Sequence, residues 1–130
     1  MISHQEVMDF SREFGLGPQV IEKDYVLGWI LAGINRQAAI KGNWVFKGGT
    51  CLKKCFFETY RFSEDLDFTI TNDEHLNPEF LKRTFSEVVD WVYGEAGLEI
   101  PADRIRFLAY ENPRGKTAVE GRIYYRGPLQ

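Results

Sequence analysis

The most constraining pattern in the sequence is a strict alternation of polar and apolar residues near the middle of the chain. The apolar positions of this segment are Leu66, Phe68 and Ile70. A period of two places successive side chains on opposite faces of a β-strand, so Leu66–Thr71 is predicted to be a strand with one buried face. Asp65 and Asp67 then project from the same face, about 6–7 Å apart along the chain.

The segments around this strand predict a mixed α/β domain with N-terminal helices. Apolar residues at helical spacing indicate helices over Ser3–Phe14, Gln19 to about Ile40, Thr50 to about Glu58 and Pro78 to about Tyr93. Further strands are expected at Trp44–Phe46, Ile105–Tyr110 and Thr117–Tyr125. Ser3 and Glu6 are placed to form a capping box, and Gly42 is expected to close the second helix. A polar loop between the last two strands predicts an antiparallel pair.

Length and composition limit the classes of protein that are possible. The 130 residues correspond to a single domain over 1–130, and the 44% hydrophobic content excludes a disordered chain. No apolar run is long enough to span a membrane, and the N-terminus lacks a secretory signal. Two cysteines cannot form a disulfide framework, so a cytoplasmic protein is expected. The net charge of −3 predicts no bulk attraction to nucleic acid.

The two aspartates are candidate metal ligands. Aspartate is depleted in strands, and two carboxylates side by side repel one another unless a cation lies between them. Mg²⁺ favours one or two carboxylates together with substrate phosphate oxygens. Asp65 and Asp67 therefore suit a Mg²⁺ site, although an isolated Asp-x-Asp also fits the solvent face of an edge strand.

A second candidate site lies between the predicted strand 44–46 and the helix that follows it. Gly48 and Gly49 allow a ligand to approach the backbone closely, and a helix start that includes Thr50 offers N–H groups to an anion. Lys53 in the first helical turn adds positive charge. This segment fits a phosphate cradle, and the alternative is a plain tight turn.

The run from Phe46 to Phe68, FKGGTCLKKCFFETYRFSEDLDF, resembles the signature of the AbiEii/AbiGii toxin family of nucleotidyltransferases, within the polymerase-β-like superfamily. The family pattern is a Gly-Gly-Thr/Ser turn, a helix, and then Arg-Phe-Ser-x-Asp-Leu/Ile-Asp. Segments 21–27 (IEKDYVL) and 124–129 (YYRGPL) resemble an N-terminal helix and a later strand and turn of the family. The resemblance therefore extends over most of the chain.

This resemblance implies a polymerase-β-like nucleotidyltransferase core and a role for each motif residue. Gly48, Gly49, Thr50 and Lys53 would bind an NTP, and Ser63 would lie near its phosphates. Asp65 and Asp67 would be catalytic and would hold Mg²⁺. The implied reaction moves NMP from an NTP to a macromolecular acceptor, such as a tRNA or a protein. The implied context is the toxin component of a toxin–antitoxin pair, with a cognate antitoxin as partner.

One element of the superfamily pattern is absent from this sequence. Superfamily members normally use a third carboxylate from a later strand, which would follow the Tyr-x-Gly-Pro turn. The sequence stops at Gln130, so we expect an N-terminal part of such a protein that transfers nothing by itself. Glu120 is the only substitute within reach, and a surface residue paired with Arg122 is the favoured interpretation.

Other interpretations remain open from the sequence. A catalytically inactive nucleotidyltransferase-fold module that only binds a partner or nucleotide is the main alternative, and a glycosyltransferase with a metal-binding Asp-x-Asp is a second. Glu22, Lys23 and Asp24 suggest a solvated helix face, although the resemblance favours Lys23 facing the active-site cleft. His4 and His75 are expected at the surface.

Overall fold

The computed structural model describes residues 1–40, 43–47, 67–70 and 73–129. Within these ranges the protein has the mixed α/β fold that the sequence predicts. The elements in chain order are α1 (His4–Phe14), α2 (Pro18–Asn35), β1 (Trp44–Lys47), β2 (Asp67–Ile70), the 3₁₀ turn η2 (Asp73–Leu76), α4 (Pro78–Ala96), the 3₁₀ turn η3 (Ala102–Arg104), β3 (Arg106–Glu111) and β4 (Thr117–Arg122). The predicted helix at 50–58 lies outside the described residues.

Helix α1 begins with the predicted capping box. The Ser3 side chain accepts a hydrogen bond from the backbone N–H of Glu6 at 3.1 Å, and the Glu6 carboxylate accepts one from the backbone N–H of Ser3 at 3.3 Å. Two N–H groups near the helix start are thereby satisfied reciprocally. The helix ends at Gly15, which adopts the left-handed conformation.

Helix α2 is shorter than the sequence predicts. It ends at Asn35, whereas we expected it to continue to about Ile40 with Gly42 as its end. After Asn35 the backbone turns through hydrogen bonds that span three residues, from Gln37 to Ile34 and from Ile40 to Gln37. These turns place the Ile40 side chain in the core. The chain therefore leaves the helical path after Asn35.

In the described ranges no helix is long and apolar enough to cross a membrane.

Helix α4 is longer than the sequence predicts. Asn77 caps its N-terminus by accepting hydrogen bonds from the N–H groups of Glu79 and Phe80. The helix passes through Gly94 and ends at Ala96, with Gly97 in the left-handed conformation. The helix therefore extends past the end at about Tyr93 that the sequence predicts, and its capping residue Asn77 was not predicted.

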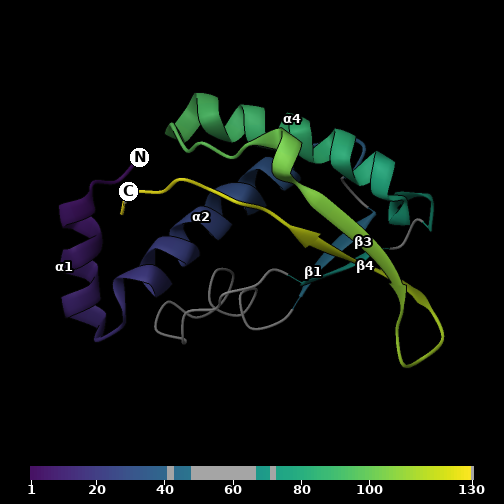
Figure 1. Ribbon diagram of the computed structural model, residues 1–130, viewed down its shortest axis with the longest axis horizontal. Coiled ribbons are helices and arrows are strands. Elements are labelled where there is room, and N and C mark those ends of the chain that lie inside the picture. The colour runs from purple at the N-terminus through teal and green to yellow at the C-terminus, as the bar shows by residue number, and fades with distance from the viewer. Residues whose placement is uncertain (41–42, 48–66, 71–72, 130) are drawn as a thin grey trace.

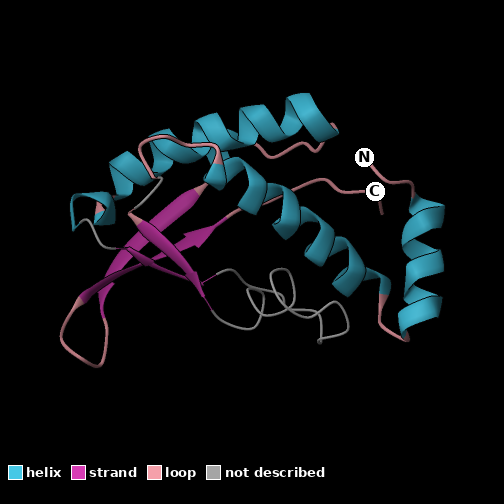
Figure 2. Ribbon diagram, turned by 180° about the vertical axis from the view of Figure 1, so that it is seen from behind, coloured by secondary structure: helices cyan, strands magenta, loops and turns pink. Residues whose placement is uncertain are grey.

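The described strands form two separate antiparallel pairs (Figure 2). In the first pair, β1 and β2 align Trp44 with Ile70 and Lys47 with Asp67. In the second, β3 and β4 form the predicted hairpin, with Arg106 opposite Arg122. The hairpin is the long ribbon that ends in an open loop in Figure 1.

Helix α2 lies at the centre of the molecule and contacts both α1 and α4 (Figure 1). Its apolar residues are spread around the whole helix, which is typical of a helix buried on several sides. Trp29 of α2 packs on Trp91 of α4, with ring centroids 5.9 Å apart. Phe85 of α4 contacts one aromatic ring from each strand pair, Trp44 at 6.2 Å and Phe107 at 5.1 Å. These contacts join the two strand pairs to one core.

Candidate functional site

The pairing of β1 with β2 brings together the two ends of the motif segment. Lys47, the last residue of β1, lies opposite Asp67, the first residue of β2. The chain therefore leaves this end of the ladder just before Gly48 and returns to it at Asp67. Gly48, which follows Lys47 in the sequence, and Asp67 are thus both next to the same end of one short ladder.

Most residues of the predicted site lie outside the described residues. These are Gly48, Gly49, Thr50, Lys53, Ser63 and Asp65. Asp67 is described only through its backbone, at the start of β2. The roles expected for these seven residues stay predictions. The described residues are those that come before and after this segment in the sequence.

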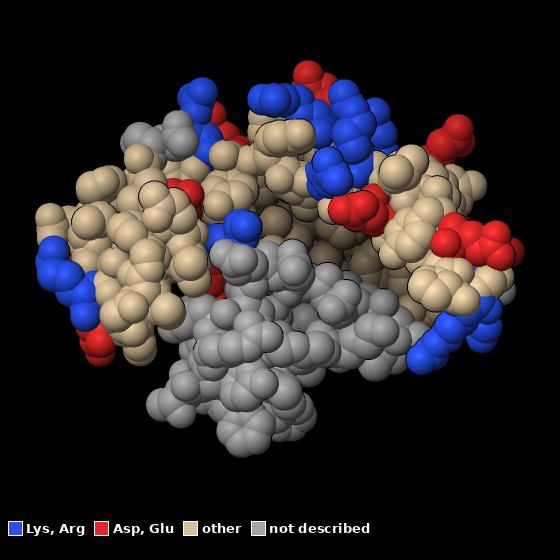
Figure 3. Space-filling model, turned by 60° about the horizontal axis from the view of Figure 1, so that its bottom comes forward, with Lys and Arg blue, Asp and Glu red and all other residues tan. Residues whose placement is uncertain are grey.

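A cleft of about 810 Å³ lies between α2, the two strand pairs and the segment after β4. This volume is within the usual range for sites that bind small molecules. Figure 3 shows this side of the molecule hollowed, with Lys and Arg side chains gathered along part of its edge. The residues lining the cleft are Lys23, Val26, Leu27, Ile30, Ile34, Trp44, Ile70, Leu81, Phe85, Phe107, Tyr110 and 119–125.

One face of α2 forms a wall of this cleft. Its residues at 23, 26, 27, 30 and 34 follow helical spacing and line the cavity. Lys23 is the charged member of this row, at the end of the helix nearest α1. Lys23 therefore faces a cleft and brings an ammonium group to an otherwise apolar helix face, while its place in the active site stays a prediction.

The opposite wall comes from the hairpin and from residues 123–125. Arg122 and Glu120 both line the cleft, and their side chains form an ion pair at 3.6 Å, as the sequence favoured. Both side chains are largely exposed, so this pair contributes little to stability. Tyr110, Tyr124 and Tyr125 add aromatic rings. The charged groups of the lining are therefore Lys23 and the Arg122–Glu120 pair, set among aromatic rings and an apolar floor, which suits a ligand with a charged part and a flat aromatic part.

The comparison with protein families decides which family the chain belongs to. The model of the family described as "Nucleotidyl transferase AbiEii toxin, Type IV TA system" matches residues 29–119, more than two-thirds of the chain. The chain belongs to the AbiEii family. Neither the search of curated proteins nor the search of solved structures gave a match. The matched part of this AbiEii chain contains the 46–68 signature and extends from the second half of α2 into β4.

Two acidic residues of α2 contradict the expected solvated helix face. Glu22 is 8% exposed and Asp24 is 9% exposed. The Glu22 carboxylate accepts a hydrogen bond from the backbone N–H of Leu129 at 2.8 Å. The solvated interpretation was wrong because it treated the charges as a surface feature, whereas a distant backbone segment satisfies the buried Glu22.

His75 is also buried, contrary to expectation. Its ring nitrogen Nδ1 accepts a hydrogen bond from the indole N–H of Trp44 at 3.1 Å, and the ring stacks on Phe80 at 4.3 Å. An isolated histidine carries no pattern that reveals such partners in a sequence. Its role in this AbiEii chain is to join β1 to the start of α4. His4 is exposed, as expected.

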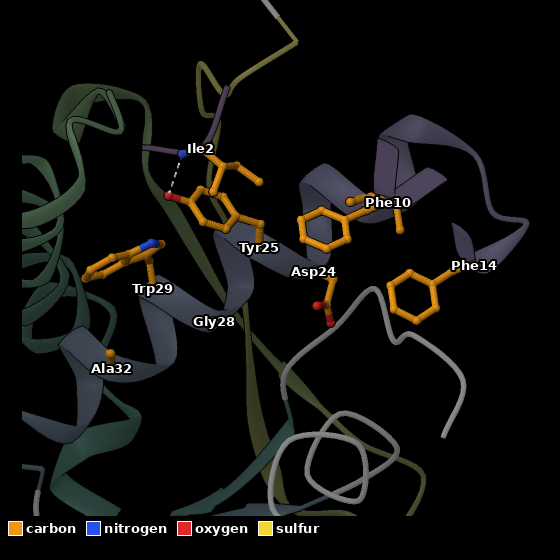
Figure 4. A pocket seen from close by; sticks show the side chains of 9 residues that line it. Ile2, Phe10, Phe14, Asp24, Tyr25, Gly28, Trp29 and Ala32 are labelled. Carbon is orange, nitrogen blue, oxygen red and sulfur yellow. Dashed lines mark hydrogen bonds between the residues drawn. The ribbon is translucent and has the colours of Figure 1, made fainter. Parts of the chain in front are cut away.

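A second, smaller cavity lies on the other side of α2 (Figure 4). It has a volume of about 470 Å³ and is lined mainly by the apolar and aromatic residues that hold α1 to α2. Asp24 lies at its edge, and the backbone N–H of Ile2 donates a hydrogen bond to the Tyr25 hydroxyl at 3.2 Å. With a single carboxylate in its lining, this cavity has less polar chemistry to offer than the cleft.

The described part of the chain holds no group of three or more His, Cys, Asp or Glu side chains that could bind a metal ion. The two motif aspartates, which the sequence predicts as metal ligands, lie outside the described side chains. Carboxylate oxygens are the donors that Mg²⁺ prefers. The chemistry of this donor pair fits Mg²⁺ better than a metal that selects thiolate or imidazole ligands.

Proposed function

We propose that this AbiEii domain is a Mg²⁺-dependent nucleotidyltransferase that moves NMP from an NTP to a macromolecular acceptor in the cytoplasm. The acceptor would be a tRNA or a protein, and a cognate antitoxin would counteract the activity. The observation that carries the proposal is the family match, because it includes both the Gly-Gly-Thr turn and the Asp-x-Asp strand. The register of Lys47 with Asp67 supports it, because Gly48 and Asp67 are both next to the same end of one ladder.

The proposed roles follow from the chemistry of each group. Gly48, Gly49 and Thr50 would bind phosphate oxygens through backbone N–H groups and a hydroxyl, with Lys53 and Ser63 nearby. Asp65 and Asp67 would hold Mg²⁺, which when bound offsets negative charge on the phosphates. The cleft beside the ladder would receive the rest of the nucleotide. Its aromatic side chains suit a base, and the ammonium group of Lys23 suits a phosphate.

In the proposed transfer one bond to the α-phosphorus forms and one breaks. An acceptor hydroxyl oxygen forms a bond to the α-phosphorus of the NTP. The bond from that phosphorus to the oxygen of the β-phosphate breaks, and pyrophosphate leaves. The hydroxyl proton passes to solvent.

The test is transfer of label from α-labelled NTPs by the full-length protein to total RNA and to a protein extract. We expect Asp65→Asn and Asp67→Asn each to lower the rate by at least about a hundredfold, because each removes a negative metal ligand at nearly constant shape. The melting temperature should stay close to that of the wild type. Asp90→Asn, on the exposed face of α4, is the matched control and should transfer at the wild-type rate.

Two results would contradict the proposal. Wild-type rates in both aspartate variants would show that these residues are not catalytic. NTP binding without transfer by the wild type, on any acceptor, would favour the catalytically inactive binding module instead.

A further inference from the structure

The buried carboxylate of Glu22 connects α2 to a segment more than a hundred residues away in the sequence. Its Oε2 accepts the backbone N–H of Leu129 at 2.8 Å, and its negative charge also acts on the Tyr125 hydroxyl. Burial raises the pKa of the Tyr125 hydroxyl, and the negative charge of Glu22 raises it further. The Glu22 side chain therefore holds the C-terminal end of segment 125–129 and acts on the hydroxyl at its other end.

Gly127, in the middle of this segment, packs directly against Glu22. A Cβ atom at position 127 would lie 2.7 Å from Oε2 and 2.8 Å from Cδ of Glu22. Real Cβ atoms essentially never approach that closely, so an alanine at position 127 would force the Glu22 carboxylate to shift. Gly127 and Pro128 are both buried.

The segment held by Glu22 is continuous with a wall of the cleft. Tyr124 and Tyr125 line the cavity, while Lys23, the neighbour of Glu22, lines it from α2. Glu22 itself is absent from the lining, so it acts on the cleft through the residues that it holds. Glu22 and segment 125–129 also lie outside the residues matched by the family model.

Other contacts hold the same segment from its far side. The backbone N–H of Arg126 donates to the carbonyl oxygen of Glu99 at 2.9 Å, and their side chains form an exposed ion pair at 3.4 Å. Just before the segment, the Arg104 guanidinium lies 4.5 Å from the centre of the Tyr124 ring. Loss of the Glu22 contact should therefore shift the wall of the cleft without releasing the whole segment.

We propose that Glu22 is a positioning residue for the nucleotide. It fixes segment 125–129 against α2 and thereby holds in place the wall of the cleft that Tyr124 and Tyr125 form. The inference rests on the proposed function, since it takes the cleft as the place where an NTP binds. A group displaced by about 1 Å can lose a large part of its effect on a bound substrate.

The experiment compares Glu22→Ala, Glu22→Gln and Gly127→Ala with the wild type in the full-length protein. Amide hydrogen exchange at Leu129 reports on the contact, and the Kd for each common NTP reports on the cleft. Both are measured at a temperature where all variants are folded. Glu22→Ala removes the contact, and Gly127→Ala forces the carboxylate away without altering it. Both should speed exchange at Leu129 and raise the NTP Kd by at least about tenfold.

Two further variants serve as controls. Glu22→Gln keeps a side chain of nearly the same shape with an oxygen that can accept the Leu129 N–H, so its Kd should stay close to the wild-type value. Glu99→Ala removes only the exposed ion pair with Arg126 and should leave the Kd unchanged. If Glu22→Ala fails to fold, Tyr125→Phe takes its place, since it keeps the Leu129 contact and loses only the hydroxyl. A smaller rise in Kd is then expected.

The outcomes separate this inference from the proposed function. Faster exchange at Leu129 with an unchanged NTP Kd would show that Glu22 is merely structural and would overturn the inference. Unchanged exchange in both Glu22→Ala and Gly127→Ala would overturn it as well. A wild type that binds none of the NTPs would overturn the proposed function first, and the positioning role with it.

Discussion

At the scale of single residues, Gly33 shows how closely α2 and α4 approach each other. A Cβ atom at Gly33 would lie 2.8 Å from Cγ1 of Val88 and 3.3 Å from the Trp91 ring. Val88 is fully buried and its side chain is stiff, so it cannot move aside cheaply. Gly94 is the opposite case, because a Cβ there would meet nothing within 4 Å.

We therefore expect two glycine-to-alanine changes within helices to have opposite signs. Overpacking at Gly33→Ala should cost about 1–3 kcal/mol, which exceeds the gain of about 0.5–1 kcal/mol from replacing a helical glycine. Gly94→Ala has only the gain and should raise the free energy of unfolding by about 0.5–1 kcal/mol. Urea unfolding measures both. Equal effects in the two variants would show that helix propensity, and not contact between the helices, decides at Gly33.

The sequence predicted single residues well where a local rule decides them. Ser3 and Glu6 were identified as a capping box because both partners lie within one helical turn. The exposed pair of Glu120 and Arg122 was likewise local. Glu22 and His75 were misread because their partners, Leu129 and Trp44, are distant in the sequence. Long-range hydrogen bonds carry no periodic signal.

At the scale of elements, the termini of α4 illustrate what a cap contributes. Asn77 satisfies two backbone N–H groups at the helix start, those of Glu79 at 2.8 Å and Phe80 at 3.4 Å. Without the cap, these two N–H groups would have to donate hydrogen bonds to water.

Asn77→Ala should therefore lower the free energy of unfolding by about 1 kcal/mol, the usual cost of losing such a cap. Ser86→Ala is the control, because the Ser86 hydroxyl only donates to the Lys82 carbonyl inside the same helix. It should change stability by less than about 0.5 kcal/mol. The measurement is urea unfolding followed by circular dichroism. A loss as large in Ser86→Ala as in Asn77→Ala would argue against the cap as the cause.

The type of most elements could be predicted from periodicity, and their ends could not. The alternation at 66–71 and the polar loop after Tyr110 correctly indicated β2 and the β3–β4 hairpin. The end of α2 depends on burying Ile40 in the core, which is a tertiary requirement. For the site, the sequence named the motif, and the structure added the Lys47–Asp67 register and the cleft beside it. Neither the antiparallel register nor the cleft follows from spacing alone.

At the scale of the whole molecule, burial is distributed unevenly between the helices and the hairpin. Residues of α2 and α4 such as Ile34, Val88 and Val92 are almost completely buried. Most residues of β3 and β4 are exposed, including Leu108 at 67%, and only a few, such as Phe107, pack on the core. The turn of the hairpin is held by local bonds of Asn112 to Arg114 and Lys116.

This distribution predicts that the hairpin opens more readily than the helical core. Local opening has a lower free energy where few apolar contacts must be broken. Amide hydrogen exchange should therefore be slowest in the middle of α2 and α4, and fastest near the hairpin turn at 112–116. Ile34→Ala leaves a cavity in the core and should lower the opening free energy of the helix amides by about 2–4 kcal/mol. It should leave exchange near the turn unchanged, because those amides open without disturbing the core. If Ile34→Ala accelerated exchange equally in the hairpin and the helices, the molecule would open as one cooperative unit, and the cleft between hairpin and α2 would open only on global unfolding.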